Sequence, residues 1–315
     1  MTGEHLPAVP PVQNEPESPP REPCPPPLEW HNIAQKFHSS AESILINAGD
    51  AELKVTRFGE GRPIVFLPLT GGTARLFCLT AWLLKDQYRS LIFDPPLWRK
   101  RPSVRHLVSR SAEAFSMALE HLCPEGADVY APLFSSQVAL AIMAQSPKVI
   151  RSAFLQTAWA HREFTLAERA LLSMLSVCPL RLRRLPLWQR MAIENHRRWF
   201  PPFDETRFGF LLQELGETPA CDAALALLAS TKTDLSPQLS TITQPVLVLH
   251  CEGEGEGVAR AEAILEEKLR NVQREDFYHS GHFPFLTHPQ RLIKVIKPFW
   301  PSQVTNNSGE KPDVK

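Results

Sequence analysis

Short apolar runs alternate along this chain with segments whose apolar residues recur at helical spacing. The runs are short enough for buried strands and occupy 63–68, 88–94, 128–133, 149–156, 245–250 and 272–278. Helical spacing appears at 73–85, 104–122, 135–145, 259–269 and 289–300. Alternation of strand and helix predicts a parallel sheet that is covered by helices on both faces.

Two further features refine this prediction. Segments 44–49 and 52–58 flank a turn at Gly49-Asp50 and predict an antiparallel pair ahead of the parallel series. Residues from about 160 to 240 interrupt the alternation with helical sequence, which predicts a lid over the strand ends, where open α/β sheets bind ligands. We therefore predict the α/β-hydrolase fold: a mostly parallel central sheet with helices on both faces and a helical lid insertion.

The two ends of the chain differ in composition from the part between them. Ten of the 30 prolines fall in residues 1–27, which hold too few core-forming residues to offset their ordering entropy. We expect a disordered proline-rich tail over 1–28, one α/β domain over 29–301 and a second disordered tail over 302–315.

Charge and cysteine content exclude several classes of function. The 34 Lys and Arg residues balance the 34 Asp and Glu residues, so the basic footprint of a nucleic-acid-binding protein is absent. The six cysteines are scattered, without metal-ligand spacing or a disulfide framework, which predicts reduced thiols, no metal and no cofactor. The chain start lacks the features of a secretory signal, and no run of about 18 apolar residues occurs. We expect a cytoplasmic protein.

The clearest candidate for chemistry is a histidine near the end of the chain. HSGHFPFLTHP (279–289) lies between the last predicted strand and the last predicted helix. Its Gly-His-Phe-Pro run resembles the loop that carries the catalytic histidine in the α/β-hydrolase superfamily, which assigns His282 to that position. The alternative is a loop histidine held only by backbone hydrogen bonds.

Catalysis in this superfamily needs a triad: a serine, a histidine that takes the proton of the serine, and a carboxylate that orients the histidine. The sequence identifies the carboxylate less clearly than the histidine. CEGEGEGV (251–258) follows the strand 245–250 and resembles the Gly-Glu-x-Asp loop of many superfamily members. By that register Glu254 takes the acid position, with Glu252 and Glu256 as alternatives. A flexible acidic turn without contact to the histidine fits the same pattern.

The nucleophile turn departs from the superfamily pattern, Gly-x-Ser-x-Gly. In DVYAPLFSSQVALAIMA (128–144), alignment with the helix starts of relatives puts Leu133 in the serine position and Ala131 and Ser135 in the glycine positions. The sharp turn supports this register, because the residues two before and two after its apex must be small. An apex at Ser135 or Ser136 would place larger residues at those two positions.

A leucine at the apex has no nucleophilic atom, so the acyl-enzyme route is closed. By comparison with the loops of relatives, the backbone N–H groups of Thr70 and Phe134 take the oxyanion-donor positions and retain the ability to bind a carbonyl or carboxylate. The alternative for the loop is a plain Gly71-Gly72 turn that enters a helix.

Three segments resemble the maspardin branch of that superfamily. FLPLTGGTARLF (66–77) is similar to the opening loop of maspardin, HSGHFPFL (279–286) to its Gly-Gly-Asn-Phe-Pro-Tyr-Leu stretch, and FGFLLQELGETPACDAALALLAST (208–231) to its leucine-rich lid. The resemblance covers roughly residues 30–300 and implies an adaptor-like protein of the cytosol and of endosomal or trans-Golgi membranes. Maspardin differs in keeping the elbow serine and in carrying asparagine where this chain has His282.

Together these residues predict a non-catalytic protein, with Leu133 in a vestigial triad, that binds an acyl-like ligand or a protein partner. The alternative is an active, esterase-like serine hydrolase that uses Ser135 or Ser136 with the same histidine and acid. The stretch 179–203, rich in Arg, Trp and Leu, is compatible with peripheral contact to an anionic membrane or a partner. An amphipathic lid helix with solvated arginines is the simpler interpretation of that stretch.

Overall fold

The computed structural model describes residues 28–202 and 204–300. Apart from residue 28, the tails predicted at 1–28 and 302–315 lie outside the described residues. Within these residues one sheet has the strand order β1-β2-β4-β3-β6-β7-β8-β9, and β5 pairs with β2 off this path. The strands are β1 Glu42–Ala48, β2 Ala51–Phe58, β3 Arg62–Phe66, β4 Tyr88–Phe93, β5 Leu97–Trp98, β6 Ala127–Pro132, β7 Ile150–Gln156, β8 Val246–Cys251 and β9 Val272–Phe277.

The sheet begins antiparallel and continues parallel. Strand β2 runs antiparallel to β1, β4 and β5, whereas β4, β3, β6, β7, β8 and β9 pair in parallel. The first pair closes at Ala48 opposite Ala51, across the predicted Gly49-Asp50 turn. This topology confirms the predicted fold class, the α/β-hydrolase fold.

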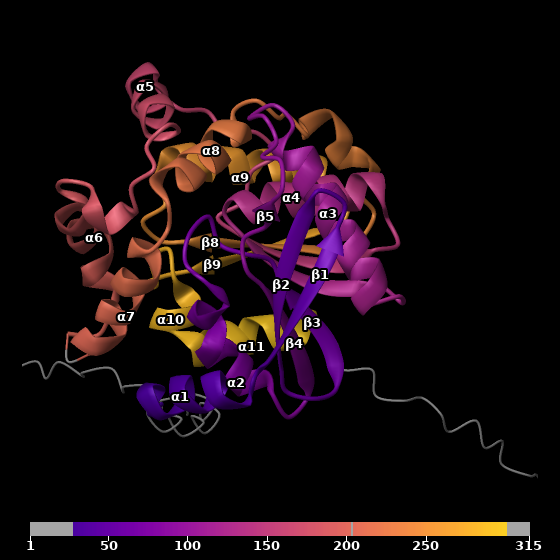
Figure 1. Ribbon diagram of the computed structural model, residues 1–315. Coiled ribbons are helices and arrows are strands. Elements are labelled where there is room, and N and C mark those ends of the chain that lie inside the picture. The colour runs from indigo at the N-terminus through magenta and orange to yellow at the C-terminus, as the bar shows by residue number, and fades with distance from the viewer. Residues whose placement is uncertain (1–27, 203, 301–315) are drawn as a thin grey trace, which may run out of the picture.

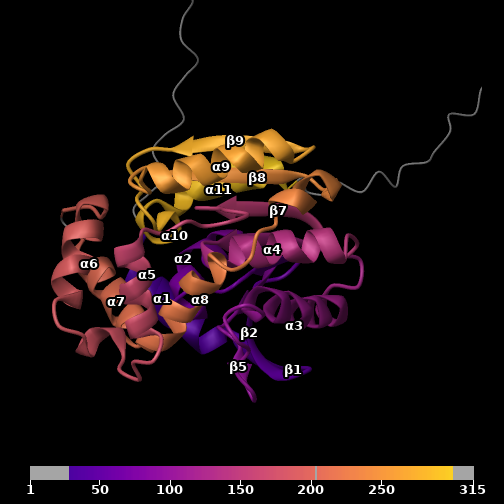
Figure 2. The ribbon, with the colours of Figure 1, turned by 90° about the horizontal axis from the view of Figure 1, so that it is seen from above.

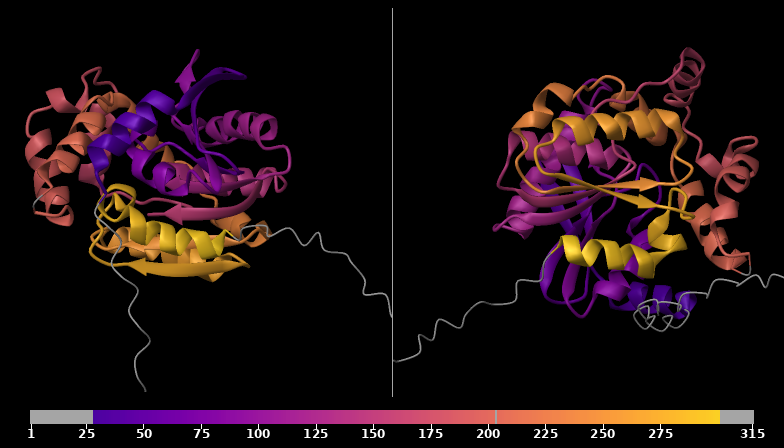
Figure 3. Two further views of the ribbon diagram at one scale, coloured as in Figure 1. Left: turned by 90° about the horizontal axis from the view of Figure 1, so that it is seen from below. Right: turned by 180° about the vertical axis from the view of Figure 1, so that it is seen from behind.

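Helices cover both faces of the sheet (Figure 1). On one face lie α3, α4 and α9, on the other α1, α2 and α11, and the view from behind separates α9 from α11 by the strands (Figure 3). Their bounds are α1 Trp30–Ser40, α2 Cys78–Leu84, α3 Leu107–Leu122, α4 Phe134–Gln145, α9 Glu256–Lys268, α10 Pro284–Thr287 and α11 Pro289–Phe299.

Two apolar clusters fill the layers between sheet and helices. The cluster beneath α3, α4 and α9 includes Phe115, Ile142 and Leu265, and the opposite cluster includes Phe66 and Trp300. Helix α4 is buried along nearly its whole length, as the apolar sequence of 135–145 predicts. Because α4 follows directly on β6, this burial fixes the position of the turn between them.

The connection from β7 to β8 forms the lid. It holds α5 Leu166–Leu175, α6 Trp188–His196, α7 Glu205–Gly216 and α8 Ala220–Ser230, and α5, α6 and α7 gather at one end of the molecule (Figure 2). A short 3₁₀ turn, Arg197–Trp199, places Trp199 beside Gly253 and Gly281, which follow the carboxyl ends of β8 and β9. The lid therefore covers the edge of the sheet where parallel strands end.

Helix α1 is absent from the elements predicted from the sequence. Its buried residues Trp30, Ile33 and Phe37 lie at helical spacing, but the polar residues between them weaken the pattern.

Among the described residues, no helix combines the length and apolar character that crossing a bilayer requires.

Candidate functional site

The turn between β6 and α4 has Leu133 at its apex. Its backbone angles, φ 52° and ψ −125°, lie in a region that costs a non-glycine residue about 1–3 kcal/mol. Its N–H donates to the carbonyl of Gln156 at 2.9 Å. The flanking Ala131 and Ser135 are 0% and 1% exposed, so larger side chains would not fit there. A strained turn thus presents a hydrocarbon at the position that the Gly-x-Ser-x-Gly pattern assigns to a serine.

The two neighbouring serines are engaged elsewhere. The Ser135 hydroxyl donates to the carbonyl of Pro68 at 2.5 Å, and the Ser136 hydroxyl donates to the carbonyl of Leu133 at 2.6 Å. Both side chains are buried, and neither hydroxyl pairs with an imidazole among the described contacts. This geometry disfavours Ser135 or Ser136 as the nucleophile of an active hydrolase.

An imidazole and a carboxylate meet at the carboxyl end of the sheet. His282 Nδ1 lies 2.9 Å from Glu254 Oε2, and the Glu254 side chain is only 2% exposed. The second oxygen of Glu254 accepts the Thr157 hydroxyl at 2.6 Å. The other two acidic candidates are elsewhere, since Glu252 accepts the backbone N–H of His279 and the Glu256 side chain is 92% exposed. The structure therefore places Glu254, of the three, beside the predicted histidine.

One buried residue joins the histidine loop to the apex of the turn. Gln156 at the end of β7 donates from Nε2 to the carbonyl of His282 at 2.8 Å, and its own carbonyl accepts the Leu133 N–H. The Tyr130 hydroxyl in turn donates to Oε1 of Gln156. These contacts hold the two parts of the site in a fixed relation, even though the chain separates them widely.

The His282 imidazole is set up for proton transfer. Burial lowers the pKa of His282, but the hydrogen bond to Glu254 and the charge of that carboxylate outweigh burial and raise the pKa overall. With Nδ1 engaged, Nε2 is the nitrogen left for acid–base chemistry. An imidazole suited to act as a base and a carboxylate that orients it thus lie together, and no hydroxyl is bonded to this imidazole among the described contacts.

The lid packs directly on this pair. The His196 ring lies 5.1 Å from the His282 ring at an angle of 87°, and burial together with the charge of His282 lowers the pKa of His196 to about 4. The Trp199 indole lies against two glycines of positive φ, Gly253 and Gly281. A Cβ at Gly253 would come within 2.7 Å of Cζ2 of Trp199, and one at Gly281 closer still. Both glycines are needed for the lid to close in this way.

The predicted oxyanion donors lie beside a cavity. Phe134 is the first residue of α4, where a backbone N–H has no intrahelical acceptor, and Thr70 lies in the loop after β3 with a buried hydroxyl that has no partner among the described residues. The lid and sheet hold this loop, because Gly72 N–H donates to Thr218 Oγ1 at 2.9 Å and Ala74 N–H to Asp94 Oδ1 at 2.6 Å.

The cavity encloses about 280 Å³ and has mostly apolar walls. It lies between the loop after β3, the segment around β5, helix α3 and lid helix α8, and neither Leu133 nor His282 lines it. Its walls are formed by Pro68, Leu69, Thr70, Pro95, Pro96, Leu97, Trp98, Arg101, Pro102, Leu107, Ser111, Phe115, Phe134, Ser135, Asp222, Leu225 and Ala226.

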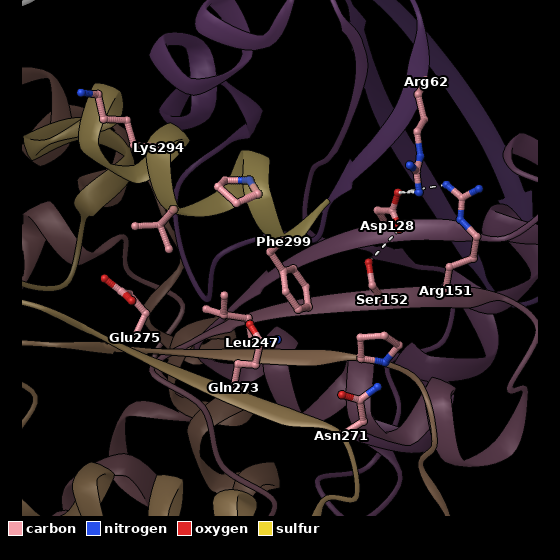
Figure 4. A pocket seen from close by; sticks show the side chains of 13 residues that line it. Arg62, Asp128, Arg151, Ser152, Leu247, Asn271, Gln273, Glu275, Lys294 and Phe299 are labelled. Carbon is pink, nitrogen blue, oxygen red and sulfur yellow. Dashed lines mark hydrogen bonds and ion pairs between the residues drawn. The ribbon is translucent and has the colours of Figure 1, made fainter. Parts of the chain in front are cut away.

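A larger hollow, of about 790 Å³, lies at the opposite edge of the sheet, where the parallel strands begin (Figure 4). At one side of it lies Asp128, buried and bonded to Arg62, Arg151 and Ser152 at 2.5, 3.0 and 2.7 Å (Figure 4). Open α/β sheets bind ligands at the carboxyl ends of their strands, so we interpret this ion cluster as structural. In the described ranges, no group of three or more His, Cys, Asp and Glu side chains is arranged to hold a metal ion.

Several residues of the site do not stand out in the sequence. Thr157 orients the acid, Gln156 joins two loops, and His196 and Trp199 cover the imidazole. A polar Gln-Thr pair that ends an apolar strand is a signal for the first two. The lid residues carry no such signal, because their contacts join segments about 50–85 positions apart.

Comparisons with known proteins agree with the fold. No protein-family model matches the chain. A hydrolase from Pseudomonas aeruginosa has a TM-score of 0.68 at 16% identity, covering 83% of this chain and 99% of its own. A thermophilic esterase from Thermogutta terrifontis has a TM-score of 0.66 at 16% identity, covering 82% and 98%. An enol-lactonase from Burkholderia xenovorans has a TM-score of 0.66 at 15% identity, covering 82% and 99%.

The sequence similarity is more local. A pimeloyl-[acyl-carrier protein] methyl ester esterase from Photobacterium profundum is 32% identical over 80 residues, which are 25% of this chain and 31% of the esterase. The chain thus matches less than a third of that relative's length. Taken with the strand order, these likenesses show that the chain has the α/β-hydrolase fold.

Proposed function

We propose that this protein is a non-catalytic α/β-hydrolase-fold module that binds a small acyl-like ligand. The observation that carries the proposal is the hydrocarbon side chain of Leu133 at the apex of a strained turn. His282 and Glu254 remain paired, but the acyl-enzyme route needs an attacking oxygen, and the buried hydroxyls of Ser135 and Ser136 are bonded to backbone carbonyls.

The cavity beside the apex supports an acyl-like ligand. Its apolar walls suit a hydrocarbon chain, and the N–H groups of Thr70 and Phe134 at its edge suit a carbonyl or carboxylate head. Its volume of about 280 Å³ is near the lower end of small-molecule sites and almost twice that of an engineered cavity of about 150 Å³ that binds benzene. A short or medium acyl chain is therefore the ligand class that we propose.

The resemblance to maspardin extends the proposal to an adaptor-like role. The similar segments are the loop 66–77, the histidine loop 279–286 and the lid stretch 208–231. Two of these border the cavity, and the third holds His282. In this proposal the bound ligand stabilises the lid, whose helix α8 borders the cavity, and the protein binds a partner in that state. The pimeloyl-[acyl-carrier protein] methyl ester esterase that is similar over 80 residues supports the acyl class of ligand.

The test combines a binding measurement with a nucleophile probe. Octanoate is titrated into the protein by calorimetry, and the protein is separately incubated with a fluorophosphonate. We expect saturable octanoate binding and no labelling. Ala226→Trp fills the cavity and should abolish binding, whereas Ala223→Trp on the same helix, outside the cavity lining, should leave it intact. Absence of octanoate binding would contradict the ligand proposal.

An active serine hydrolase is the second candidate function, and the intact pair of His282 and Glu254 favours it. It predicts fluorophosphonate labelling that Ser135→Ala or Ser136→Ala removes. Such labelling would overturn the non-catalytic proposal and leave the fold unaffected.

A further inference from the structure

Exposed apolar side chains are concentrated on one part of the lid. Thirteen large hydrophobic residues are exposed in the described chain, and eight of them fall between positions 166 and 193. We call these eight the lid patch: Leu166, Leu171, Met174, Val177, Leu180, Leu187, Met191 and Ile193. Such a concentration of exposed apolar side chains in one segment makes it a candidate interaction surface.

Helix α5 shows the exposure most clearly, because it has no buried residue. Leu166 is 82% exposed and Met174 is 62% exposed, although apolar residues recur along this helix at amphipathic spacing. A capping box of Thr165 and Glu168 stabilises the start of the helix locally. Part of the apolar face of α5 is therefore left without a partner.

The same region carries excess positive charge. Between positions 166 and 199 seven arginines oppose two glutamates, an excess of five positive charges (7 − 2), in a chain whose formal net charge is zero. Arg169, Arg184 and Arg190 are among the exposed arginines. Three of the seven have nearby carboxylates: Arg181 and Arg183 share Glu217, and Arg190 pairs with Glu194. Cationic and apolar side chains are thus interspersed along one segment of the lid.

We propose that the lid patch docks onto an anionic lipid surface. Interfacial binding has two components: apolar residues insert at the level of the headgroups, and arginines contact lipid phosphates or carboxylates. Helix α5 projects from the body of the molecule and α6 lies at the outer side of the lid (Figure 1), which suits a broad lipid surface better than a partner that needs a groove. The inference does not depend on the acyl ligand, because the patch and the cavity are separate.

Vesicle sedimentation tests this proposal with the whole chain. Vesicles of pure phosphatidylcholine are compared with vesicles that contain 30 mol% phosphatidylserine, where we expect binding about tenfold tighter or more, weakened by salt. Met174→Glu and Met191→Glu should each weaken binding to the anionic vesicles about tenfold. Met117→Glu is the matched control, because Met117 is also an exposed methionine on a helix, at 50% exposure, but lies on α3 outside the patch.

The outcomes separate clearly. The proposal is supported if the protein binds anionic vesicles selectively, if both lid variants weaken this binding and if Met117→Glu preserves it. Circular dichroism must show that all variants are folded. No vesicle binding, equal binding to both vesicle types, or an equal effect of Met117→Glu overturns it, and absence of vesicle binding would leave the patch to a protein partner. Octanoate binding is measured on the same variants and should not change.

Discussion

Replacement of Leu133 by serine tests the vestigial site most directly. The apex backbone is already in the conformation that presents a nucleophile, with φ 52° and ψ −125°. His282 is paired with Glu254 at 2.9 Å, and Thr70 and Phe134, the predicted oxyanion donors, both line the nearby cavity. Leu133→Ser therefore supplies the one group that is lacking without rebuilding the surroundings.

The expected magnitudes follow from the structure. A positioned general base contributes about 10²–10⁴-fold, which corresponds to about 2.7–5.5 kcal/mol of barrier. We therefore expect Leu133→Ser to hydrolyse p-nitrophenyl butyrate at least about 100-fold faster than the wild-type protein. Leu133 is partly buried against the second apolar cluster, so the substitution should cost about 1–2 kcal/mol of unfolding free energy.

The assay needs two matched variants. Leu133→Ala removes the same apolar side chain without adding an oxygen, and Leu133→Ser combined with His282→Ala removes the base. Neither of these two control variants should show the gain in hydrolysis that we expect for Leu133→Ser. If Leu133→Ser is folded but no more active than Leu133→Ala, the assignment of the apex or of the base is wrong.

Two further predictions concern the acid and the lid. Glu254→Gln removes the carboxylate that raises the pKa of His282, so the imidazole should titrate at lower pH by NMR. A raised pKa in the folded state means that protonated His282 stabilises the fold. This stabilisation is complete below the unfolded pKa of about 6.5 and disappears as the pH rises through the folded pKa. Urea unfolding should therefore show a larger loss of unfolding free energy for the variant at pH 5.5 than at pH 9. An identical loss at both pH values would contradict this linkage. Gly253→Ala meets both a positive φ and the Trp199 ring, whereas Gly255→Ala meets a positive φ alone, so the first should cost about 1–3 kcal/mol more than the second. Adding Trp199→Ala should remove most of that difference in chemical denaturation, and a difference that persists would exclude the ring as its cause.

The local pattern of apolar and polar residues predicted most of the fold. The alternation of apolar runs and helical stripes depends on which faces of each element are buried, and this periodicity is visible in any single segment. The position of the apex also followed from local sterics, because only a turn centred on Leu133 has small residues, Ala131 and Ser135, on either side. Helix α1 was not predicted, because its three buried side chains are separated by polar residues.

Contacts between distant segments decided what the pattern left open. The register of the loop favoured Glu254 but left Glu252 and Glu256 as alternatives, and it is the packing of the loop after β8 against the histidine loop that brings Glu254 to His282. The closure of Trp199 on Gly253 and Gly281 and the walls of the cavity likewise join elements that lie far apart in the chain.

The sequence by itself determined the order of strands β1 to β4 and β6 to β9, of most helices that cover them, and the absence of an oxygen at the apex, because these depend on neighbouring residues. The tertiary structure alone decided which carboxylate orients the imidazole, where an apolar cavity remains and which lid residues stay exposed. Those properties depend on the distances between side chains of separate elements, and no local periodicity encodes such distances.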